Sequence, residues 1–237
     1  MDMEKRRKPI IGIIGKMLPQ KEKDYWHREE SVDDLRYLIV KNGGIAIILT
    51  PSEKTMSFND NDLGDPTILS EEEIEDLHVQ ADLCDGLILQ GGDYSFAYEE
   101  KLAAYAIEKD IPLLGICAGF NNILRALGSN TYEDRTKGHA HYDIDYRHHI
   151  DVKENTLLHE LVGSTDYSVN SFHNMVANRE RVEAYATINA CSDDGLVEGF
   201  ELKDKRFILA LKWHPELLKE ETFTKRLFAR FLKACER

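Results

Sequence analysis

The sequence predicts an α/β fold with a doubly wound, mostly parallel sheet, flanking helices and a β-rich C-terminal half. Three observations carry this prediction. Short apolar runs alternate with amphipathic helical patterns through the first half, the second half consists of shorter β-rich pieces between polar turns, and no repeat or Pro/Gly/Ser-rich linker interrupts the chain. With 237 residues, the chain is long enough to bury a substantial core.

The parallel part of the sheet is predicted from four short apolar runs. Strands that are buried on both faces have nearly continuous hydrophobic sequences instead of alternating ones. The four runs cover residues 9–15, 44–49, 85–90 and 111–116. In an open sheet of this type, ligands bind beyond the carboxyl ends of the strands.

Helices are predicted in the segments between these strands. Ser31 and Gly43 are expected to cap the two ends of the first helix. Ser70 and Glu73 have the spacing of a capping box at the start of the second. The three predicted helices cover residues 31–43, 70–83 and 98–109.

The second half is predicted to be rich in β-structure and to end in a helix. Five short pieces have strand character: residues 148–153, 166–171, 182–188, 197–202 and 206–213. The last helix presents one apolar stripe, which we interpret as core: Phe223, Leu227, Phe228, Phe231 and Leu232. We expect a flexible N-terminus over residues 1–8 and a single domain over 9–237. Residues 54–67 are the most loop-like segment and are expected to flank a site.

Composition excludes several classes of function. The net charge of −13, from 30 basic and 43 acidic residues, argues against nucleic acid as a partner. No apolar run reaches the length of roughly 18 residues that a membrane span needs. Four cysteines are scattered without a CxxC pair, so neither a disulfide framework nor a zinc site is expected, and the cytoplasm is the predicted location.

Cys117 stands between Gly115 and Gly119 where a predicted strand becomes a helix. This is the layout of a nucleophile elbow, in which glycines permit a sharp turn and the helix dipole favours a thiolate. A free thiol has a pKa of about 8.5, so an active nucleophile also needs a base. From this pentapeptide alone, a buried structural cysteine is an equally good interpretation.

Two further stretches supply partners for such a cysteine. His214 follows an apolar strand and precedes Glu216, an order suited to a general base held by a carboxylate. Gly91 and Gly92 end another strand, where a turn can direct backbone N–H groups at an oxyanion. Taken singly, the histidine is better explained as a surface residue and the glycines as an ordinary turn.

Together these stretches resemble the class I glutamine amidotransferase superfamily, and most closely its γ-glutamyl hydrolase branch (peptidase C26). The likeness is carried by GICAG, KWHPE, LQGGD, VNSFH and DGLVEGFE. The resemblance implies a flavodoxin-like core and a Cys–His–Glu triad at Cys117, His214 and Glu216. It also implies oxyanion donors at the backbone of Gly92 and Ala118. The implied ligand is a small γ-glutamyl compound, with no metal or organic cofactor.

The chain departs from that pattern around the substrate. Relatives commonly carry Gln at the position of Asn121 and often Arg at that of Ala118, while Met175 replaces the Gln of a VNSxHxQ pattern. The expected substrate contacts are Asn121, Ser171, Phe172 and His173. A structural role at the end of a strand is an equal alternative for His173.

The segment 138–149 is rich in histidine and aspartate. His139, His141, His148 and His149 lie near Asp143 and Asp145, residue types that bind transition metals. Their spacing places only the first two on one side of a strand. A surface loop is therefore the favoured interpretation, and no metal site is predicted.

The expected activity is hydrolysis of a γ-glutamyl amide through a thioester, with release of glutamate and an amine. Polyamine-derived, folate-like and nucleotide-linked amines all stay open, as does a homo-oligomer. The alternatives are a glutaminase that supplies ammonia to a separate synthetase, a non-catalytic binding module, and a peptide-cleaving cysteine hydrolase on the same fold.

Overall fold

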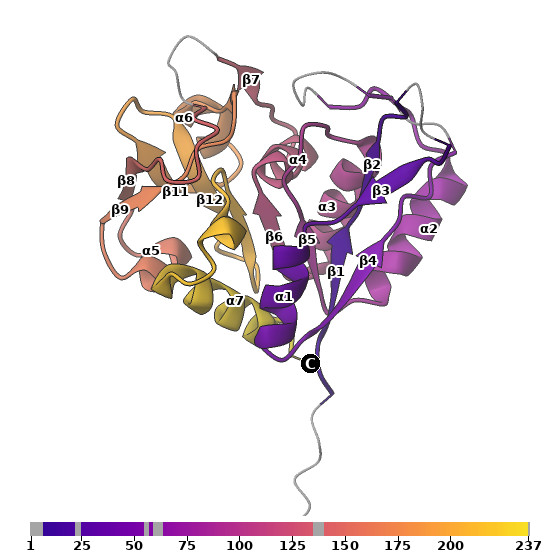
Figure 1. Cartoon of the computed structure of the whole chain (residues 1–237), viewed down its shortest axis with the longest axis horizontal. Coiled ribbons are helices and arrows are strands. Elements are labelled where there is room, and N and C mark those ends of the chain that lie inside the picture. The colour runs from indigo at the N-terminus through magenta and orange to yellow at the C-terminus, as the bar shows by residue number, and fades with distance from the viewer. Residues whose placement is uncertain (1–6, 22–24, 55–56, 59–63, 135–139, 237) are drawn as a thin grey trace, which may run out of the picture.

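The computed structural model describes residues 7–21, 25–54, 57–58, 64–134 and 140–236. Its centre is a nine-stranded sheet with the order β4-β1-β5-β6-β13-β12-β11-β8-β9 (Figure 1). The strands of this sheet are β1 (Ile10–Ile14), β4 (Ile45–Leu49), β5 (Gly86–Leu89), β6 (Leu113–Ile116), β8 (His148–Val152), β9 (Asp166–Val169), β11 (Thr187–Ser192), β12 (Val197–Glu201) and β13 (Ile208–Leu211). Two small ribbons pair β2 (Lys16–Leu18) with β3 (Arg28–Glu30) and β7 (Tyr132–Glu133) with β10 (Met175–Val176).

The sheet is mixed, with one parallel half and one antiparallel half. From β4 to β13 every pairing is parallel, and from β13 to β9 every pairing is antiparallel. The predicted α/β fold with a parallel N-terminal part and a β-rich C-terminal part is confirmed. The carboxyl ends of β1, β5, β6 and β13 consequently meet at one edge of the sheet.

Helices cover both faces of the sheet, as the doubly wound prediction requires (Figure 1). Side chains of α2, α3, α4 and α6 belong to one apolar cluster, and those of α1, α5 and α7 to the other. The helices are α1 (Asp33–Lys41), α2 (Glu71–Asp82), α3 (Ala97–Lys109), α4 (Ala118–Ala126), α5 (Leu157–Val162), α6 (Arg179–Glu183) and α7 (Thr222–Ala234), with a 3-10 turn η2 (Pro215–Leu218) before the last. The apolar stripe of α7 is core, as predicted.

The predicted helix caps are confirmed in part. Ser70 accepts a hydrogen bond from the Glu73 N–H, and the Glu73 carboxylate accepts one from the Ser70 N–H, so the capping box exists. Gly43 follows α1 with φ of 89°, as a helix-ending glycine does. The prediction that Ser31 caps α1 is wrong, because the N-cap residue is Val32, whose N–H donates to the Gln90 side chain.

One predicted strand is largely wrong. Residues 182–188 were expected to form β-structure, but α6 occupies their beginning, and only Thr187 and Ile188 enter β11. The side chain of Asn178 accepts a hydrogen bond from the Arg181 N–H and so starts the helix. Apolar spacing over so few residues does not distinguish one turn of helix from a strand.

Several predictions fall partly outside the described residues. Of the N-terminal segment 1–8, residues 1–6 are outside, and Arg7 forms an ion pair with Asp85 at 2.6 Å. The loop 54–67 is described only at 54, 57–58 and 64–67, none of it in a helix or strand. The four cysteines are buried thiols outside any disulfide. No helix in the described ranges combines the length and apolarity needed to cross a membrane.

Candidate active site

Cys117 lies directly after β6 and is the N-cap residue of α4. Its backbone angles are φ 53° and ψ −101°, in a region that residues other than glycine rarely adopt. Such strain is typical of a side chain that the surrounding structure holds for a purpose. The Cys117 N–H donates to the Leu211 carbonyl oxygen of β13 at 2.9 Å, which ties the strained turn to the sheet.

The glycine at position 119, two residues after Cys117, is required for steric reasons. A Cβ added to Gly119 would lie 2.1 Å from the carbonyl oxygen of Leu89, so only glycine lets α4 approach the end of β5 this closely. The close approach brings Cys117 and the turn after β5 to the same edge of the sheet. The elbow layout predicted from the sequence is therefore present in the backbone.

His214 and Glu216 lie at the end of the neighbouring strand β13. The distance from His214 Nδ1 to Glu216 Oε1 is 2.7 Å, and the Glu216 side chain is 2% exposed. The remaining Glu216 oxygen, Oε2, is buried and has no hydrogen-bond partner. The carboxylate thus contacts the Nδ1 edge of the imidazole through one oxygen.

The pKa of His214 is raised well above its ordinary value of 6.5. Burial of the ring favours its neutral form, but the charges of Glu216 and of the Cys117 sulfur, with hydrogen bonds to both groups, outweigh that effect. The imidazole is therefore charged at neutral pH. A cationic imidazole bonded to both groups is the arrangement that supports a cysteine thiolate.

Gly91 shows how closely the histidine and the cysteine converge. A Cβ added at Gly91 would lie 2.5 Å from His214 Cε1 and 3.4 Å from Cys117 Cβ. The histidine ring consequently packs against the bare Cα of Gly91, with Cys117 beside it. Any side chain at this position would displace the ring.

Asn170 holds the backbone of His214, a role that the sequence did not suggest. Its side-chain amide donates to the His214 carbonyl oxygen at 2.9 Å and accepts the His214 N–H at 2.8 Å. Asn170 is fully buried. The only sequence signal was its place in the VNSFH stretch, directly before the predicted substrate contacts.

The predicted oxyanion donors, Gly92 and Ala118, belong to the two turns that meet at Cys117. Ala118 is the first residue of α4, and Gly92 follows the end of β5 with φ of 149°, where a side chain would be strained. The two backbone positions belong to neighbouring strand ends, since β5 pairs with β6 in parallel. Their role as donors stays a prediction.

The predicted substrate contacts from the VNSFH stretch divide into two groups. The Phe172 ring lies edge-on to the His214 ring at 5.7 Å, beside the candidate base. Ser171 and His173 are buried. His173 Nδ1 is 3.2 Å from the Met175 carbonyl oxygen, and its Nε2 is 3.7 Å from the buried Glu198 carboxylate. Those contacts favour the structural alternative for His173.

Asn121 is paired with a buried lysine. Lys212, directly after β13, donates from Nζ to Asn121 Oδ1 at 2.6 Å, and both residues are fully buried. The Lys212 ammonium also lies 5.2 Å from the centre of the Phe120 ring. The sequence indicated that Asn121 is shorter than the glutamine of relatives, but it did not indicate that a lysine contacts its amide.

The histidine-rich segment is dispersed in the structure. The His141 ring stacks on Tyr146, and His149 pairs with Asp193 at 2.6 Å, while His139 lies outside the described residues. Among the residues that are described, no group of three or more His, Cys, Asp or Glu side chains is arranged to hold a metal ion.

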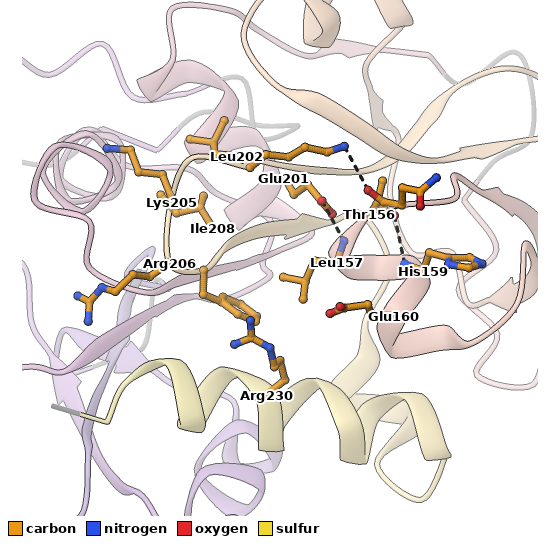
Figure 2. Close-up of a pocket in the computed structure, with 13 residues that line it drawn as sticks. Thr156, Leu157, His159, Glu160, Glu201, Leu202, Lys205, Arg206, Ile208 and Arg230 are labelled. Carbon is orange, nitrogen blue, oxygen red and sulfur yellow. Dashed lines mark hydrogen bonds between the residues drawn. The ribbon is translucent and has the colours of Figure 1, made fainter.

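A separate hollow of about 500 Å³ lies among α5, the turn between β12 and β13, and α7 (Figure 2). It is near Ile208, at the start of β13, whereas Cys117 adjoins the other end of that strand. The Glu201 carboxylate on its wall accepts the Leu157 N–H at 2.9 Å. Because this carboxylate completes the start of α5, we interpret the hollow as part of the framework.

Comparison with known families points to the same class as the sequence motifs. The family model described as Peptidase C26 matches residues 95–216 of the sequence, just over half of the chain. YvdE of Lactococcus lactis, a glutamine amidotransferase-like protein, is 28% identical over an alignment that covers 94% of this chain and 97% of that protein.

Two further relatives match over shorter stretches. γ-Glutamyl-γ-aminobutyrate hydrolase PuuD of Escherichia coli is 32% identical over 149 residues, 55% of this chain and 56% of that protein. Protein NtpR of Enterococcus hirae is 30% identical over 131 residues, 51% of this chain and 53% of that protein. The matches span about half the length of these two relatives.

A solved structure shows the same fold. The glutaminase domain of Trypanosoma brucei CTPS, with bound acivicin, has a TM-score of 0.67, 17% identity, and coverage of 96% of this chain and 94% of that one. The fold is therefore that of the class I glutamine amidotransferases.

Proposed function

The chain belongs to the peptidase C26 family, and from this premise we propose that it is a cysteine-dependent hydrolase of γ-glutamyl amides. The observation that carries the proposal is Cys117, held on a strained turn beside a charged His214 that is paired with Glu216. This set of groups suits acyl transfer through a covalent intermediate. The likeness to PuuD supports the γ-glutamyl group as the acyl part.

In the proposed first step, the Cys117 thiolate attacks the side-chain carbonyl carbon of the γ-glutamyl amide. The carbonyl π-electrons move to oxygen, and the backbone N–H groups of Gly92 and Ala118 stabilise that oxyanion. The oxyanion then collapses, the C–N bond breaks, and the His214 imidazolium gives its proton to the departing amine. A γ-glutamyl thioester on Cys117 remains.

In the second step, neutral His214 takes a proton from water, and the resulting hydroxide attacks the thioester. The C–S bond breaks, glutamate leaves and Cys117 returns to the thiolate form. Glu216 orients the imidazole through Nδ1 and stabilises its cationic form, as the carboxylate of a hydrolase triad does. None of these steps needs a metal or an organic cofactor.

The test is glutamate release by the purified chain and by its Cys117→Ala variant. The panel contains glutamine, γ-glutamyl-aminobutyrate, a γ-glutamyl polyamine, a γ-glutamyl dipeptide and an unmodified peptide. Cys191→Ala is the matched control, because Cys191 is another buried cysteine outside any disulfide, and burial raises the pKa of its thiol. We expect release from at least one γ-glutamyl amide, lost in Cys117→Ala and kept in Cys191→Ala.

A glutaminase that supplies ammonia to a synthetase is the second candidate, supported by the nearly full-length likeness to YvdE. Release from glutamine alone, stimulated by a separate partner, would favour it. Cleavage of the unmodified peptide would favour a peptidase. If no compound of the panel is cleaved and Cys117 does not react with an electrophile, the catalytic proposal is refuted and a binding module is favoured.

A further inference from the structure

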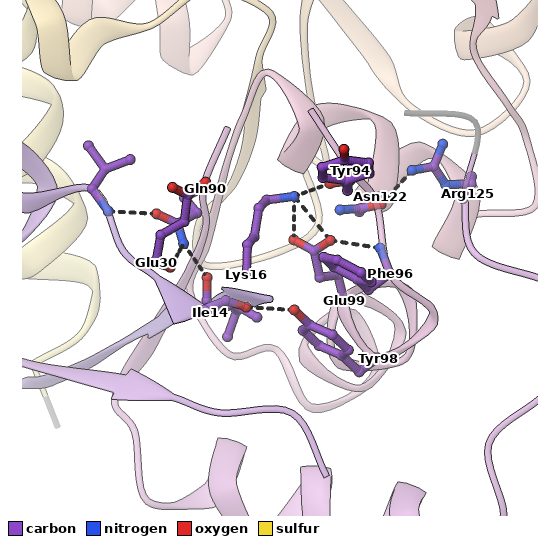
Figure 3. Close-up of polar contacts among 12 residues, drawn as sticks. Ile14, Lys16, Glu30, Gln90, Tyr94, Phe96, Tyr98, Glu99, Asn122 and Arg125 are labelled. Carbon is purple, nitrogen blue, oxygen red and sulfur yellow. Dashed lines mark hydrogen bonds and ion pairs between the residues drawn. The ribbon is translucent and has the colours of Figure 1, made fainter. Parts of the chain in front are cut away.

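Lys16 is a buried lysine that neither the fold prediction nor the proposed mechanism uses. It is the first residue of β2, two residues beyond the end of β1, and it is only 2% exposed. Its Nζ donates to the Tyr94 carbonyl oxygen at 2.5 Å and pairs with Glu99 at 3.1 Å (Figure 3). Glu99, at the start of α3, also accepts the Phe96 N–H at 2.9 Å.

These contacts enclose residues 91–96, which we call the glycine loop. The loop joins β5 to α3 and includes Gly92. Its beginning is fixed by Gln90, whose side chain donates to the Ile14 and Glu30 carbonyl oxygens at 2.8 and 3.0 Å (Figure 3). Its far end is fixed by Lys16 and Glu99 through Tyr94 and Phe96.

Lys16 also contacts Gly92 itself. A Cβ added to Gly92 would lie 2.8 Å from Lys16 Cδ and 3.1 Å from Cε. The lysine stem therefore packs against the bare Cα of Gly92, while its ammonium holds the Tyr94 carbonyl two residues later. Lys16 thus restrains the backbone at both positions.

A buried ion pair of this kind is poorly explained by stability. Removing both charges from water is costly, and well-packed uncharged residues often replace such a pair without loss. A methionine would fill the volume of the lysine stem. What a methionine lacks is the ammonium that binds the Tyr94 carbonyl and the Glu99 carboxylate at the same time.

We propose that Lys16 is a positioning residue, which fixes the direction of the Gly92 N–H toward the oxyanion formed at Cys117. The inference rests on the proposed function, because it takes Gly92 as an oxyanion donor. Lys16 touches no reacting atom. It acts through the glycine loop, with Glu99 holding its ammonium in place.

The test compares two reactions of the Cys117 thiolate, one that forms an oxyanion and one that does not. Iodoacetamide alkylates the thiolate by displacement of iodide, without an oxyanion. p-Nitrophenyl acetate acylates it through a tetrahedral oxyanion and releases p-nitrophenolate, without any γ-glutamyl group. Both rates are measured in Lys16→Met, in Lys16→Met/Glu99→Gln and in the control Lys225→Met, which removes a surface pair with Glu220.

We expect acylation by the ester to fall by roughly 10- to 100-fold in both Lys16 variants. This is less than the roughly 100- to 1000-fold that complete loss of an oxyanion donor costs, because the Gly92 N–H is misdirected and not removed. Alkylation should stay within about twofold, because the thiolate and His214 are unchanged. On a γ-glutamyl substrate, kcat should fall by a similar factor with KM nearly constant. The double variant should melt within roughly 4 °C of the wild type, because it leaves no unpaired buried charge.

Equal rates of acylation in the double variant and the wild type would overturn the inference. So would a parallel loss of acylation and alkylation, because Lys16 would then support the nucleophile or the fold in general. If the wild type releases no glutamate from any amide, the proposed function fails. The rate of acylation by p-nitrophenyl acetate still tests the role of Lys16 in that case, because this reaction needs no γ-glutamyl group. A wild type that is alkylated but not acylated has no oxyanion site, which refutes the inference outright.

Discussion

Gly91→Ala should disable the site by moving one ring. The added Cβ would lie 2.5 Å from His214 Cε1, whereas non-bonded carbon atoms prefer about 3.5–4.0 Å. The imidazole must therefore retreat by roughly 1 Å, and a misplacement of this size costs about 100-fold in rate. That loss corresponds to about 2.7 kcal/mol in the activation free energy. Gly91 has no left-handed φ, so alanine adds no backbone strain.

The assay has a catalytic arm and a substrate-free arm. In the first, kcat for glutamate release is compared with the wild type on the amide that is turned over best. In the second, the rate of alkylation of Cys117 by iodoacetamide is measured near neutral pH. Both should fall, because displacement of His214 weakens its contact with the thiolate as well as its delivery of a proton.

The control is Gly195→Ala, at a turn between β11 and β12 where an added Cβ meets nothing within 4 Å. Its φ of 83° makes alanine strained, so this variant should lose roughly 1 kcal/mol of unfolding free energy and keep full activity. Turnover and alkylation in Gly91→Ala within about threefold of the wild type would refute the geometry on which the reasoning depends.

Three further changes test other contacts. Asn170→Ala removes both hydrogen bonds to the His214 backbone, so kcat should fall about tenfold and the unfolding free energy in urea by about 2–3 kcal/mol. Lys212→Met removes the hydrogen bond from Nζ to Asn121 Oδ1, which orients a predicted substrate contact, and should raise KM for the γ-glutamyl substrate about tenfold, with kcat less affected. Burial chiefly raises the pKa of Glu53 from 4.5 to about 8, so the folded state binds a proton that the unfolded state has lost, and stability falls as pH rises through that window. Glu53→Gln should therefore add about 1–2 kcal/mol above pH 8 and almost nothing at pH 4, with solvent screening allowed for.

Each of the three has its own control. For Asn170, kcat is compared without denaturant, where every variant is fully folded. An unchanged kcat under these conditions would show that Asn170 affects stability alone. For Lys212, a double-mutant cycle with Asn121→Ala should show coupling, and strict additivity would contradict the pairing. For Glu53, the matched control is Glu75→Gln on the exposed side of α2, and a pH dependence in Glu53→Gln no larger than in this control would contradict burial as the cause.

The fold was predictable because its parallel half consists of strands that are apolar on both faces. Residues 85–90 and 111–116 match β5 and β6 closely, since short, nearly continuous apolar runs between longer helical patterns are typical of strands buried on both faces. Residues 182–188 were misassigned because one turn of helix and the start of a strand share the same apolar spacing there. The capping box at Ser70 was predictable, since its two hydrogen bonds are local in sequence.

The candidate site was predictable only where a motif carries its own geometry. His214 and Glu216 are two residues apart on one turn, so their contact follows from local structure. The hydrogen bonds between Asn170 and the His214 backbone join residues that are 44 positions apart in the sequence. Neither hydrophobic periodicity nor motif spacing predicts a contact over that distance. The pairing of Lys212 with Asn121 spans 91 residues and was missed for the same reason.

A positional rule would have found more of the site than any motif. Lys16, Gln90, Cys117 and Lys212 each lie one or two residues beyond the carboxyl end of a strand, on β1, β5, β6 and β13 in turn. These strands are consecutive neighbours in the sheet and run in parallel, so their ends share the edge where such folds bind ligands. A lysine in a sequence is ordinarily interpreted as surface, because its charge is rarely buried. Directly after a buried parallel strand that expectation reverses, since the chain has not yet left the interior, and a polar side chain there can brace the backbone around the site, as Lys16 and Gln90 do.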